Sequence, residues 1–476
     1  MSVAVALALL GVIGGLLWEG RGEGRRRDAS FASRSDLGAL HLKRGASGRV
    51  VLGRLATARW RATSKELAAP QGDSVLVLGP TQTGKTSSLV IPAILAWDGP
   101  VLAASVKDDL VRESAASRRH FGPVGILDPG REPGPLVRSF DPVALSSSWR
   151  EARSVSAALC EAGASDLPGT DALFWGQLAA KLLGPLLLAG SLAGGGLESV
   201  ARWIDGRMHG EPLSVLVAAH EEEALQWLEA SFDRDERQLA SVMATLEAIL
   251  APLLRGAGQG APFHPGRLFE QRETLYLCAP AHEQRRYRPL FTAVTQLVVE
   301  EAFVRARGQG GSLHDRLLVV LDEAAAIAPL AELDVLAATC SSHGITLLTC
   351  FQDLAQIRAR YGERASTVVN NHRTRALLSG LADPGASELL GTLTGSARTA
   401  SAKKRGRDRP EASERRTLIE AHELRQMPPY TAVVVSGRLR PARVALRPWW
   451  RQKRLRDRVL GTTAHYAARD ARSSQD

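Results

Sequence analysis

Eight consecutive residues in the first quarter of the chain have the types and spacing that bind a nucleoside triphosphate. Gly79-Pro80-Thr81-Gln82-Thr83-Gly84-Lys85-Thr86 fits the complete P-loop pattern. The glycines let the backbone wrap around phosphate oxygens, so that several N–H groups point inward at the start of a helix. Lys85 then reaches the β- and γ-phosphates, and the Thr86 hydroxyl coordinates Mg²⁺. The octapeptide therefore predicts a site for ATP and Mg²⁺.

Two adjacent acids further along the chain could complete that site. Leu317–Leu321 is an apolar run, and Asp322 and Glu323 follow it directly. Asp322 is the expected metal residue, acting on Mg²⁺ through its water shell, and Glu323 is the expected general base for the attacking water. An apolar strand that ends in two acids is by itself more often a helix cap or a surface turn. The P-loop upstream makes the catalytic interpretation the favoured one.

A glutamine at the end of the next apolar run is a third candidate. Ile345–Cys350 is followed by Phe351-Gln352-Asp353. Gln352 would lie beside the acidic pair in an α/β sheet and could sense the γ-phosphate. On spacing alone, an ordinary polar residue at a strand end fits nearly as well.

Short apolar runs predict the strands that carry these residues. Helical stretches separate most of the runs, and short buried strands that alternate with helices indicate an α/β fold with a parallel sheet. The expected strands are Val75–Leu78, 100–104, 124–128, Thr274–Cys278, Leu317–Leu321, Ile345–Cys350, Ala376–Ser379 and Ala432–Ser436.

The stretch between the two parts of this sheet has a different character. It is rich in Ala and Leu at helical spacing and poor in β-branched residues, which predicts an all-helical insertion. The expected helices are Ala152–Ala162, Ala172–Leu188, Leu213–Phe232 and Glu236–Leu254, with a break at Gly194–Gly196.

The N-terminus carries an apolar run that could anchor the chain in a membrane. Val3–Trp18 contains sixteen consecutive apolar residues, slightly fewer than the ~20 of a usual spanning helix. No Lys or Arg precedes the run and no small-residue cleavage site follows it, which favours an uncleaved anchor over a signal peptide. Arg21 and Arg25–Arg27 follow the run, so the positive-inside rule places the remainder in the cytoplasm.

Positive charge is concentrated at the two ends of the chain. The net charge is +10, whereas Glu19–Glu66 has a surplus of seven basic residues and the segment from Arg398 to the end has a surplus of twelve. Basic flanks on a mildly acidic body indicate an anionic partner, either nucleic-acid phosphates or a lipid surface. An Arg-rich composition with solvated loops is an equally good explanation of the C-terminal segment taken alone.

Together these motifs resemble the TraG/TraD-type conjugative coupling ATPases of type IV secretion, within the wider set of FtsK/HerA translocases. The resemblance covers the chain from about Val50 to Trp450. Besides the P-loop, the helical insertion, Leu321-Asp322-Glu323 and the Gln352 strand, the segments that carry it are 104–109, Phe174-Trp175, Asn370-Asn371-His372 and 378–384. Lys107 and Asp109 belong to a recurrent motif to which we assign no role.

The resemblance implies a RecA-like core and a homohexameric ring at the inner membrane. It also implies Mg-ATP hydrolysis that pulls single-stranded DNA, or a relaxase–DNA adduct, toward the channel components of type IV secretion. On this basis Lys85, Thr86, Asp322, Glu323 and Gln352 match the nucleotide-site positions of the family.

The chain departs from the family pattern in two ways. Family members usually have two spanning helices, whereas this sequence shows one short run. An Arg often precedes the strand that ends in the sensing glutamine, but here 340–344 contains none. We expect Arg373 or Arg375 to supply the positive charge that a ring ATPase offers to the γ-phosphate of its neighbour.

The expected domain order follows from these segments. It is a transmembrane anchor (1–18), a basic juxtamembrane linker (19–72), the first part of the nucleotide-binding core (73–144), the all-helical insertion (145–265), the second part of the core (266–450) and a basic tail (451–476). Two alternatives to a coupling motor stay open: a DNA translocase that serves no secretion channel, and a membrane adaptor that binds nucleotide without hydrolysing it.

Overall fold

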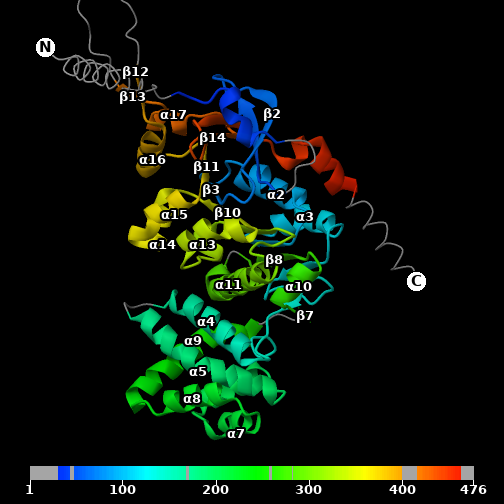
Figure 1. Ribbon diagram of the computed structural model, residues 1–476, viewed down its shortest axis with the longest axis vertical. Coiled ribbons are helices and arrows are strands. Elements are labelled where there is room, and N and C mark those ends of the chain that lie inside the picture. The colour runs from blue at the N-terminus through cyan, green and yellow to red at the C-terminus, as the bar shows by residue number, and fades with distance from the viewer. Residues whose placement is uncertain are drawn as a thin grey trace, which may run out of the picture.

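An eleven-stranded sheet forms the centre of the molecule, with helices on both of its faces and a helical region beyond one of them (Figure 1). The computed structural model describes residues 30–42, 48–167, 171–256, 260–280, 282–398 and 415–461. The predicted membrane anchor and residues 403–414 of the charged C-terminal stretch lie outside the described residues.

Seven neighbouring strands of the sheet run parallel to one another, as expected for an α/β core. In spatial order they are β11 (Thr374–Leu378), β3 (Val75–Leu78), β10 (Ile345–Phe351), β9 (Leu317–Asp322), β4 (Val101–Ser105), β8 (Thr274–Cys278) and β5 (Val124–Leu127). Four antiparallel strands extend the sheet beyond β11: β14 (Thr431–Ser436), β15 (Ala442–Ala445), β1 (Val51–Ala56) and β2 (Ala62–Ala68).

Strand β10 lies between the P-loop strand β3 and the acidic strand β9. Phe351 pairs with Leu78 on one side, and Thr349 pairs with Leu321 on the other. The Gln352 strand therefore separates the P-loop strand from the strand that ends in the two acids. Because all three strands are parallel, their carboxyl ends still meet at one edge of the sheet.

Alternate residues of the central strands enter two separate cores, as the period of two in a strand requires. Val75 and Val77 pack with α2 (Ile91–Ala96) and α3 (Asp109–Arg118) on one face, whereas Leu76 and Leu78 belong to the core of the other face. That second face is covered by α11 (Gln284–Gly308), α12 (Ala324–Ile327), α13 (Leu333–Thr339), α14 (Leu354–Tyr361) and α15 (Ala365–Asn371).

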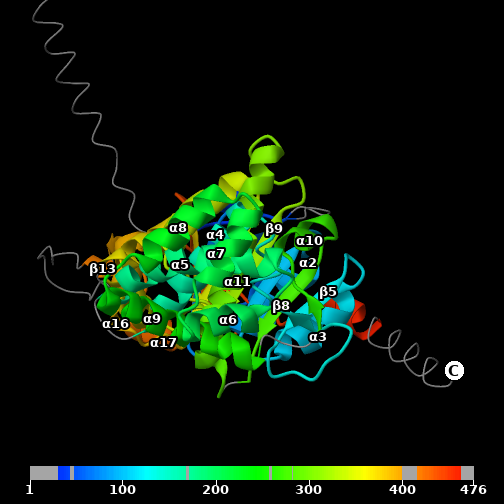
Figure 2. The same ribbon diagram turned by 90° about the horizontal axis from the view of Figure 1, so that it is seen from below.

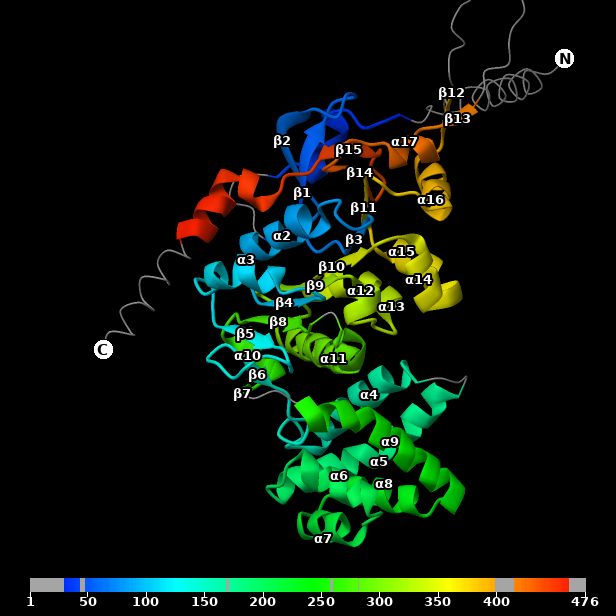
Figure 3. The ribbon, with the colours of Figure 1, turned by 180° about the vertical axis from the view of Figure 1, so that it is seen from behind.

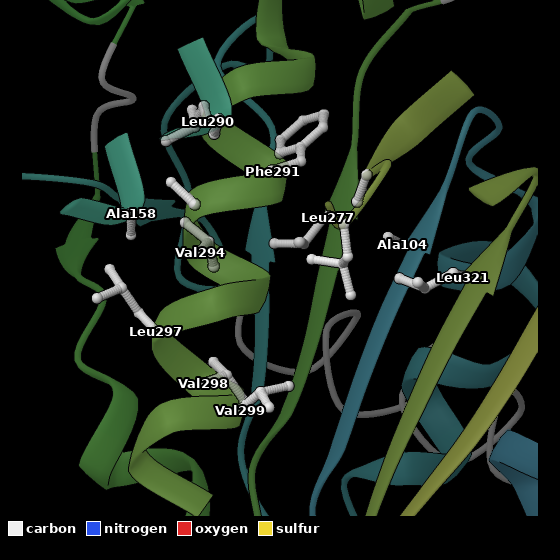
Figure 4. Close-up of a cluster of buried hydrophobic side chains, with 14 of the residues drawn as sticks. Ala104, Ala158, Leu277, Leu290, Phe291, Val294, Leu297, Val298, Val299 and Leu321 are labelled. Carbon is white, nitrogen blue, oxygen red and sulfur yellow. The ribbon is translucent and has the colours of Figure 1, made fainter. Parts of the chain in front are cut away.

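Helix α11 connects this sheet to the helical region. Figure 4 shows Leu277 of β8 beside Phe291 and Val294 of α11, and Ala158 of the helical region on the other side of α11. All of these side chains are buried. The helical region and the sheet thus share one hydrophobic core through α11.

The helical region lies at one end of the long axis of the molecule (Figures 1 and 3). Its helices are α4 (Trp149–Ala164), α5 (Ala172–Leu192), α6 (Leu197–Asp205), α7 (Gly210–Ala218), α8 (Glu222–Phe232) and α9 (Glu236–Gly256). The expected helix Leu213–Phe232 is two helices, α7 and α8, because the chain turns at Ala219-His220-Glu221. The sequence reasoning also missed α6.

Two helices of this region are long and apolar enough to cross a membrane by length and composition, α5 and Glu236–Leu254 of α9. Seen from below, α5 lies among the other helices of the region (Figure 2). Leu182, Leu183 and Leu186 of α5 are buried in the shared core. Packing within the region therefore accounts for the apolar character of α5.

Smaller elements complete the described fold. They are α10 (Pro265–Glu270), α16 (Pro384–Thr394), α17 (Ala421–Arg425), the parallel pair β6 (Arg138–Ser139) and β7 (Ala261–Pro262), and the antiparallel pair β12 (Ser396–Arg398) and β13 (Arg415–Thr417).

Both basic flanks are more structured than predicted. Strands β1 and β2 lie inside the expected linker 19–72 and extend the main sheet. Residues 453–461 of the expected basic tail are helical, with Leu455 and Val459 buried. Buried apolar residues of β1 and of the tail helix explain this, because Leu52, Leu55, Leu455 and Val459 join the core that contains α2.

Two arginines hold the far end of the helix that follows the P-loop. Arg118 is fully buried, and its guanidinium donates to the main-chain oxygens of Ile94, Trp97 and Gly99 at the end of α2. Arg458 Nη1 donates to the oxygen of Leu95 (2.5 Å). A helix end has unpaired carbonyls, and cationic donors there both satisfy them and match the helix dipole.

Replacing Arg118 should destabilise the fold without removing any group of the nucleotide site. In Arg118→Met the buried carbonyls lose a charged donor, which should lower the free energy of unfolding by about 3 kcal/mol. Urea denaturation followed by circular dichroism measures this. The matched control is Arg237→Met, because Arg237 is exposed on α9. Equal midpoints for the two variants would contradict the role given to Arg118.

Candidate active site

The P-loop residues connect β3 to a helix that begins at Thr86, as the motif requires. The helix starts with a π-helical turn, η2 (Thr86–Val90), and continues as α2. Lys85 is buried, and its Nζ donates to the main-chain oxygens of Gly79 (2.5 Å) and Pro80 (2.9 Å). The loop therefore folds around its own lysine, which places the ammonium group among the main-chain groups that face a phosphate in a P-loop.

Gly84 is required at its place by both backbone and packing. Its φ of +90° lies in the left-handed region, and a Cβ there would stand 2.8 Å from the ring of Tyr430. No residue with a side chain fits such a contact without displacing the ring. This glycine thus allows Tyr430, which is distant in sequence, to lie directly over the loop.

Asp322 lies against the P-loop, as predicted for the metal residue. Its Oδ2 accepts a hydrogen bond from Thr86 Oγ1 (2.8 Å). Burial raises the pKa of Asp322 to about 6, which outweighs the opposing effect of the Thr86 hydrogen bond, and the charge of Asp109 adds to the increase. A buried carboxylate with a raised pKa is typical of a site that receives a positive charge from a ligand.

The second oxygen of the Asp322 carboxylate has no hydrogen-bond partner among the described residues, although it is buried. A buried acceptor without a donor is unfavourable unless a cation or a water molecule satisfies it. Carboxylate and hydroxyl oxygens are the ligands that Mg²⁺ prefers. Asp322 and Thr86 therefore fit a bound Mg²⁺.

Glu323 follows β9 in an unusual conformation. Its φ and ψ are 63° and 54°, the left-handed region that side-chain-bearing residues rarely occupy. This turn separates Glu323 from the strand that buries Asp322, and Glu323 lines the cavity in front of the P-loop. Such conformations concentrate at functional sites, where the surrounding structure maintains them.

The cavity in front of the P-loop has a volume of about 730 Å³ and is open to solvent on one side. Residues 81, 82 and 84–87, Ile91 and Glu323 line it together with seven residues to which the sequence analysis gave no role. Four of these follow β4: Lys107, Asp109, Arg112 and Glu113. The other three are aromatic: Tyr430, Trp449 and Trp450.

The residues after β4 reach the cavity because β4 is the neighbour of β9. Ser105 at the end of β4 pairs with Asp322, so the segment that follows Ser105 begins beside the acids. Burial raises the pKa of Asp109, whose Oδ1 has no hydrogen-bond partner among the described residues. Lys107 and Asp109, which the sequence analysis noted as a motif without a role, are thus part of the site. Their place beside the acids follows from the pairing of β4 with β9, which the sequence alone did not indicate.

Gln352 lies close to the P-loop but outside the cavity wall. It follows Phe351 directly, and the oxygen of Phe351 accepts a hydrogen bond from the N–H of Gly79 (3.2 Å). The main-chain N–H of Gln352 donates to Gln356 Oε1 (3.0 Å). Gln352 is not among the described residues that line the cavity, so its role as a γ-phosphate sensor stays a prediction.

The two candidate arginines lie at the opposite edge of the sheet from the P-loop. Arg375 pairs with Leu76, near the beginning of β3. Arg375 is buried, and its guanidinium donates to the main-chain oxygens of His372 (2.9 Å) and Asn370 (3.2 Å). A side chain held this way is not available to a neighbouring subunit, so Arg375 is a poor candidate for the shared arginine. Arg373 is largely exposed and lies 3.9 Å from Asp73, and its role stays a prediction.

A profile of one protein family covers nearly the whole chain. The profile is described as Type IV secretory system Conjugative DNA transfer and matches residues 31–470. This chain belongs to that family. The resemblance to conjugative coupling proteins expected from the motifs is confirmed.

Curated members of the conjugative DNA transfer family are distant in sequence. The conjugal transfer protein TraG of Escherichia coli is 22% identical over 339 residues, which cover 63% of this chain and 52% of TraG. The protein VirD4 of Rhizobium rhizogenes is 23% identical over 306 residues, which cover 60% of this chain and 44% of VirD4. The chain therefore spans about half the length of the curated relatives it matches.

Solved structures of the bacterial conjugative coupling protein TrwB share the fold. An unbound form of TrwB aligns with a TM-score of 0.66 at 16% identity, over 88% of this chain and 93% of TrwB. A complex of TrwB with ADP and Mg²⁺ aligns with the same TM-score and identity, over 89% and 93% of the two chains. The predicted combination of a RecA-type core with a helical region is confirmed by this likeness.

In this family member the Asn370-Asn371-His372 segment has a structural role at the edge opposite the P-loop. His372 is fully buried, and its ring nitrogens bond to Thr349 Oγ1 of β10 (2.8 Å) and to the oxygen of Val368 (2.7 Å). Burial lowers the pKa of His372 from 6.5 to about 4, and the charge of Arg375 adds to the decrease. The histidine is therefore neutral in the folded protein at physiological pH.

The neutral histidine should make the fold sensitive to mild acid. Below pH 6.5 the unfolded chain binds a proton at His372 that the folded chain binds only below about pH 4, so stability falls as the pH falls through this window. Between pH 7 and pH 5 the wild type should lose about 2 kcal/mol more than His372→Gln, which has no group that titrates there. Urea denaturation at both pH values measures the difference. Parallel losses in the two proteins would show that His372 is not buried in its neutral form.

Proposed function

We propose that this chain is an ATPase that couples ATP hydrolysis to the transfer of DNA into a type IV secretion channel. The observation that carries the proposal is the contact between Thr86 and Asp322, with Glu323 on the wall of the same cavity. Phosphate binding, metal binding and proton abstraction need three groups of these kinds within reach of one triphosphate. The sequence separates them by more than two hundred residues, and the fold brings them to one edge of the sheet.

Each residue then has a defined part in hydrolysis. The N–H groups of the P-loop and the ammonium of Lys85 would bind the β- and γ-phosphates. Thr86 and Asp322 would hold the Mg²⁺ of the nucleotide, which neutralises phosphate charge when bound. Glu323 would orient the attacking water and accept its proton.

The relatives support ATP and Mg²⁺ as the ligands. TrwB, which shares this fold, has been solved with ADP and Mg²⁺ and with a non-hydrolysable analogue of ATP. This chain has a complete P-loop motif, and its Thr86 contacts the Asp322 carboxylate, one oxygen of which has no hydrogen-bond partner among the described residues. Both features fit the same pair of ligands.

The family and the charge distribution support DNA as the cargo. The matched profile describes conjugative DNA transfer, and the basic residues at both ends of the chain offer phosphate contacts that do not depend on base sequence. We propose single-stranded DNA or a relaxase–DNA adduct as substrate, channel components of type IV secretion as partners, and a single-pass inner-membrane location with the catalytic core in the cytoplasm. A translocase without a secretion channel is the second candidate, and the family match favours the coupling protein over it.

We further propose that the active form is a homohexamer in which an arginine of one subunit reaches the γ-phosphate of the next. Arg373 is the remaining candidate from the sequence, since its side chain is 68% exposed. An arginine finger of this kind contributes about 10³–10⁵ in rate in P-loop enzymes. A chain that lacks such an arginine would fit the alternative of a membrane adaptor that binds nucleotide without hydrolysing it.

A pair of variants tests the assignment of hydrolysis. Glu323→Gln should bind Mg-ATP about as well as the wild type but turn it over about 10²–10⁴ times more slowly, because it lacks only the base. Lys85→Ala should lose both binding and turnover, since the phosphates lose their main cation. Phosphate release and equilibrium binding of labelled ATP measure the two properties. Turnover near the wild-type rate in Glu323→Gln would refute the assignment of the base.

A further inference from the structure

Three aromatic side chains form one wall of the cavity in front of the P-loop. Tyr430, Trp449 and Trp450 line it, and they lie more than three hundred residues from the loop in sequence. Charged side chains that follow β4, among them Lys107 and Asp109, line the same cavity. In the sheet, β14 and β15 lie beyond β3 on one side and β4 lies beyond β9 on the other, so the aromatic and the charged residues reach the cavity from strands on opposite sides of the P-loop strand and the acidic strand.

Tyr430 is held rigidly over the loop. Its ring stands so close to Gly84 that a Cβ on this glycine would lie 2.8 Å from a ring carbon. Its backbone has a φ of 58°, and its main-chain oxygen accepts a hydrogen bond from Leu446 (2.8 Å). That bond ties Tyr430 to the end of β15, from which the chain leads to the two tryptophans. Positive φ in a tyrosine is costly and persists only where the neighbouring structure enforces it.

The two tryptophans occupy a closed turn. Arg447 Nη2 donates to the oxygen of Arg451 (2.6 Å), and Gln452 Nε2 donates to the oxygen of Arg447 (2.6 Å). The rings of Trp449 and Trp450 meet edge to face, with centroids 5.8 Å apart and planes at 88°. Trp449 is buried in the core with α2, whereas 42% of Trp450 is exposed. A buried indole thus supports an exposed one at the rim of the cavity.

An exposed indole beside the P-loop can stack on a flat aromatic ring that is attached to a chain of phosphates. Stacking of a nucleobase on an aromatic side chain needs an open π-face and little hydrogen bonding. Tyr430 and the two tryptophans offer aromatic surface, and the P-loop residues Gln82 and Gly84 line the same cavity. A single nucleotide can therefore reach both features.

We propose that Tyr430, Trp449 and Trp450 form the subsite for the base of the nucleoside triphosphate, with the base stacked on Trp450. This proposal rests on the proposed nucleotide site and adds the side chains that would contact the base and select it. A purine covers more of the indole than a pyrimidine does, so the subsite favours a purine. The phosphates then point toward Lys85 and the acids, and the ribose lies between.

The test separates the base from the phosphates by using two probes, ATP and inorganic tripolyphosphate. Equilibrium dialysis of labelled ATP with the full chain, with tripolyphosphate as competitor, measures both affinities. In Trp450→Ala the affinity for ATP should fall about ten- to a hundredfold while the affinity for tripolyphosphate stays the same. Trp450→Phe should retain most of the affinity for ATP, because it keeps an aromatic face. The control is Phe174→Ala, which removes a side chain that is 55% exposed on α5 and should change neither affinity.

Two results would overturn the base subsite. One is an unchanged affinity for ATP in Trp450→Ala. The other is an equal loss for ATP and tripolyphosphate, which would mean that Trp450 supports the phosphate end of the pocket. Failure of the proposed function looks different: the wild type would then bind neither probe, or Lys85→Ala would bind both as tightly as the wild type.

Discussion

The hydrogen bond between Thr86 and Asp322 joins two segments that lie 236 residues apart and that belong to strands on either side of β10. It depends on the buried carboxylate of Asp322, which is stable in its ionised form only with donors or a cation around it. The parallel strands bring the P-loop, the acids and the segment after β4 to one edge of the sheet. Arg118 and Arg458 hold the other end of the P-loop helix through the main-chain oxygens of α2. The helix that follows the P-loop is therefore held at both of its ends.

Helix α11 links the site to the helical region. It packs on β8 and β4 through one side and on α4 through the other (Figure 4). The chain then leads from α11 into β9, which ends at Asp322 and Glu323. A displacement of α4 relative to the sheet would act on the helix that directly precedes the strand ending at Asp322. This packing gives the helical region and the strands that carry the nucleotide site a shared hydrophobic core.

Local sequence patterns predicted the parts of the site that depend on local structure. The P-loop, Asp322 and Glu323 were found because each follows a short apolar strand, and the α/β class followed from the alternation of such strands with helices. The order of the strands is set by long-range packing, and so the sequence did not indicate that β10 separates β3 from β9. Lys107 and Asp109 were visible as a motif, but their place beside Asp322 follows from the pairing of β4 with β9.

The aromatic residues of the cavity and the basic segments at the two ends of the chain also take positions that depend on long-range packing, and local sequence patterns did not predict these positions. Nothing near Trp450 in the sequence indicates a nucleotide, because its contact with the site arises where the chain returns to the P-loop after β15. Arg375 was a reasonable candidate by type and position, but its guanidinium is committed to the main-chain oxygens of its own segment. The segments 19–72 and 451–476 were predicted as a linker and a tail because charge dominates their composition. The buried Leu52 and Leu55 nevertheless lie in β1, which pairs with β15 in the sheet.

One measurement tests whether this site hydrolyses ATP in support of DNA transfer. Steady-state phosphate release by the purified full chain should be followed with Mg-ATP, in the absence and in the presence of single-stranded DNA. If the site hydrolyses ATP for DNA transfer, turnover should depend on Mg²⁺ and should rise when DNA is added. Tight binding of Mg-ATP with no phosphate release under either condition would contradict it and would identify the chain as a nucleotide-binding adaptor.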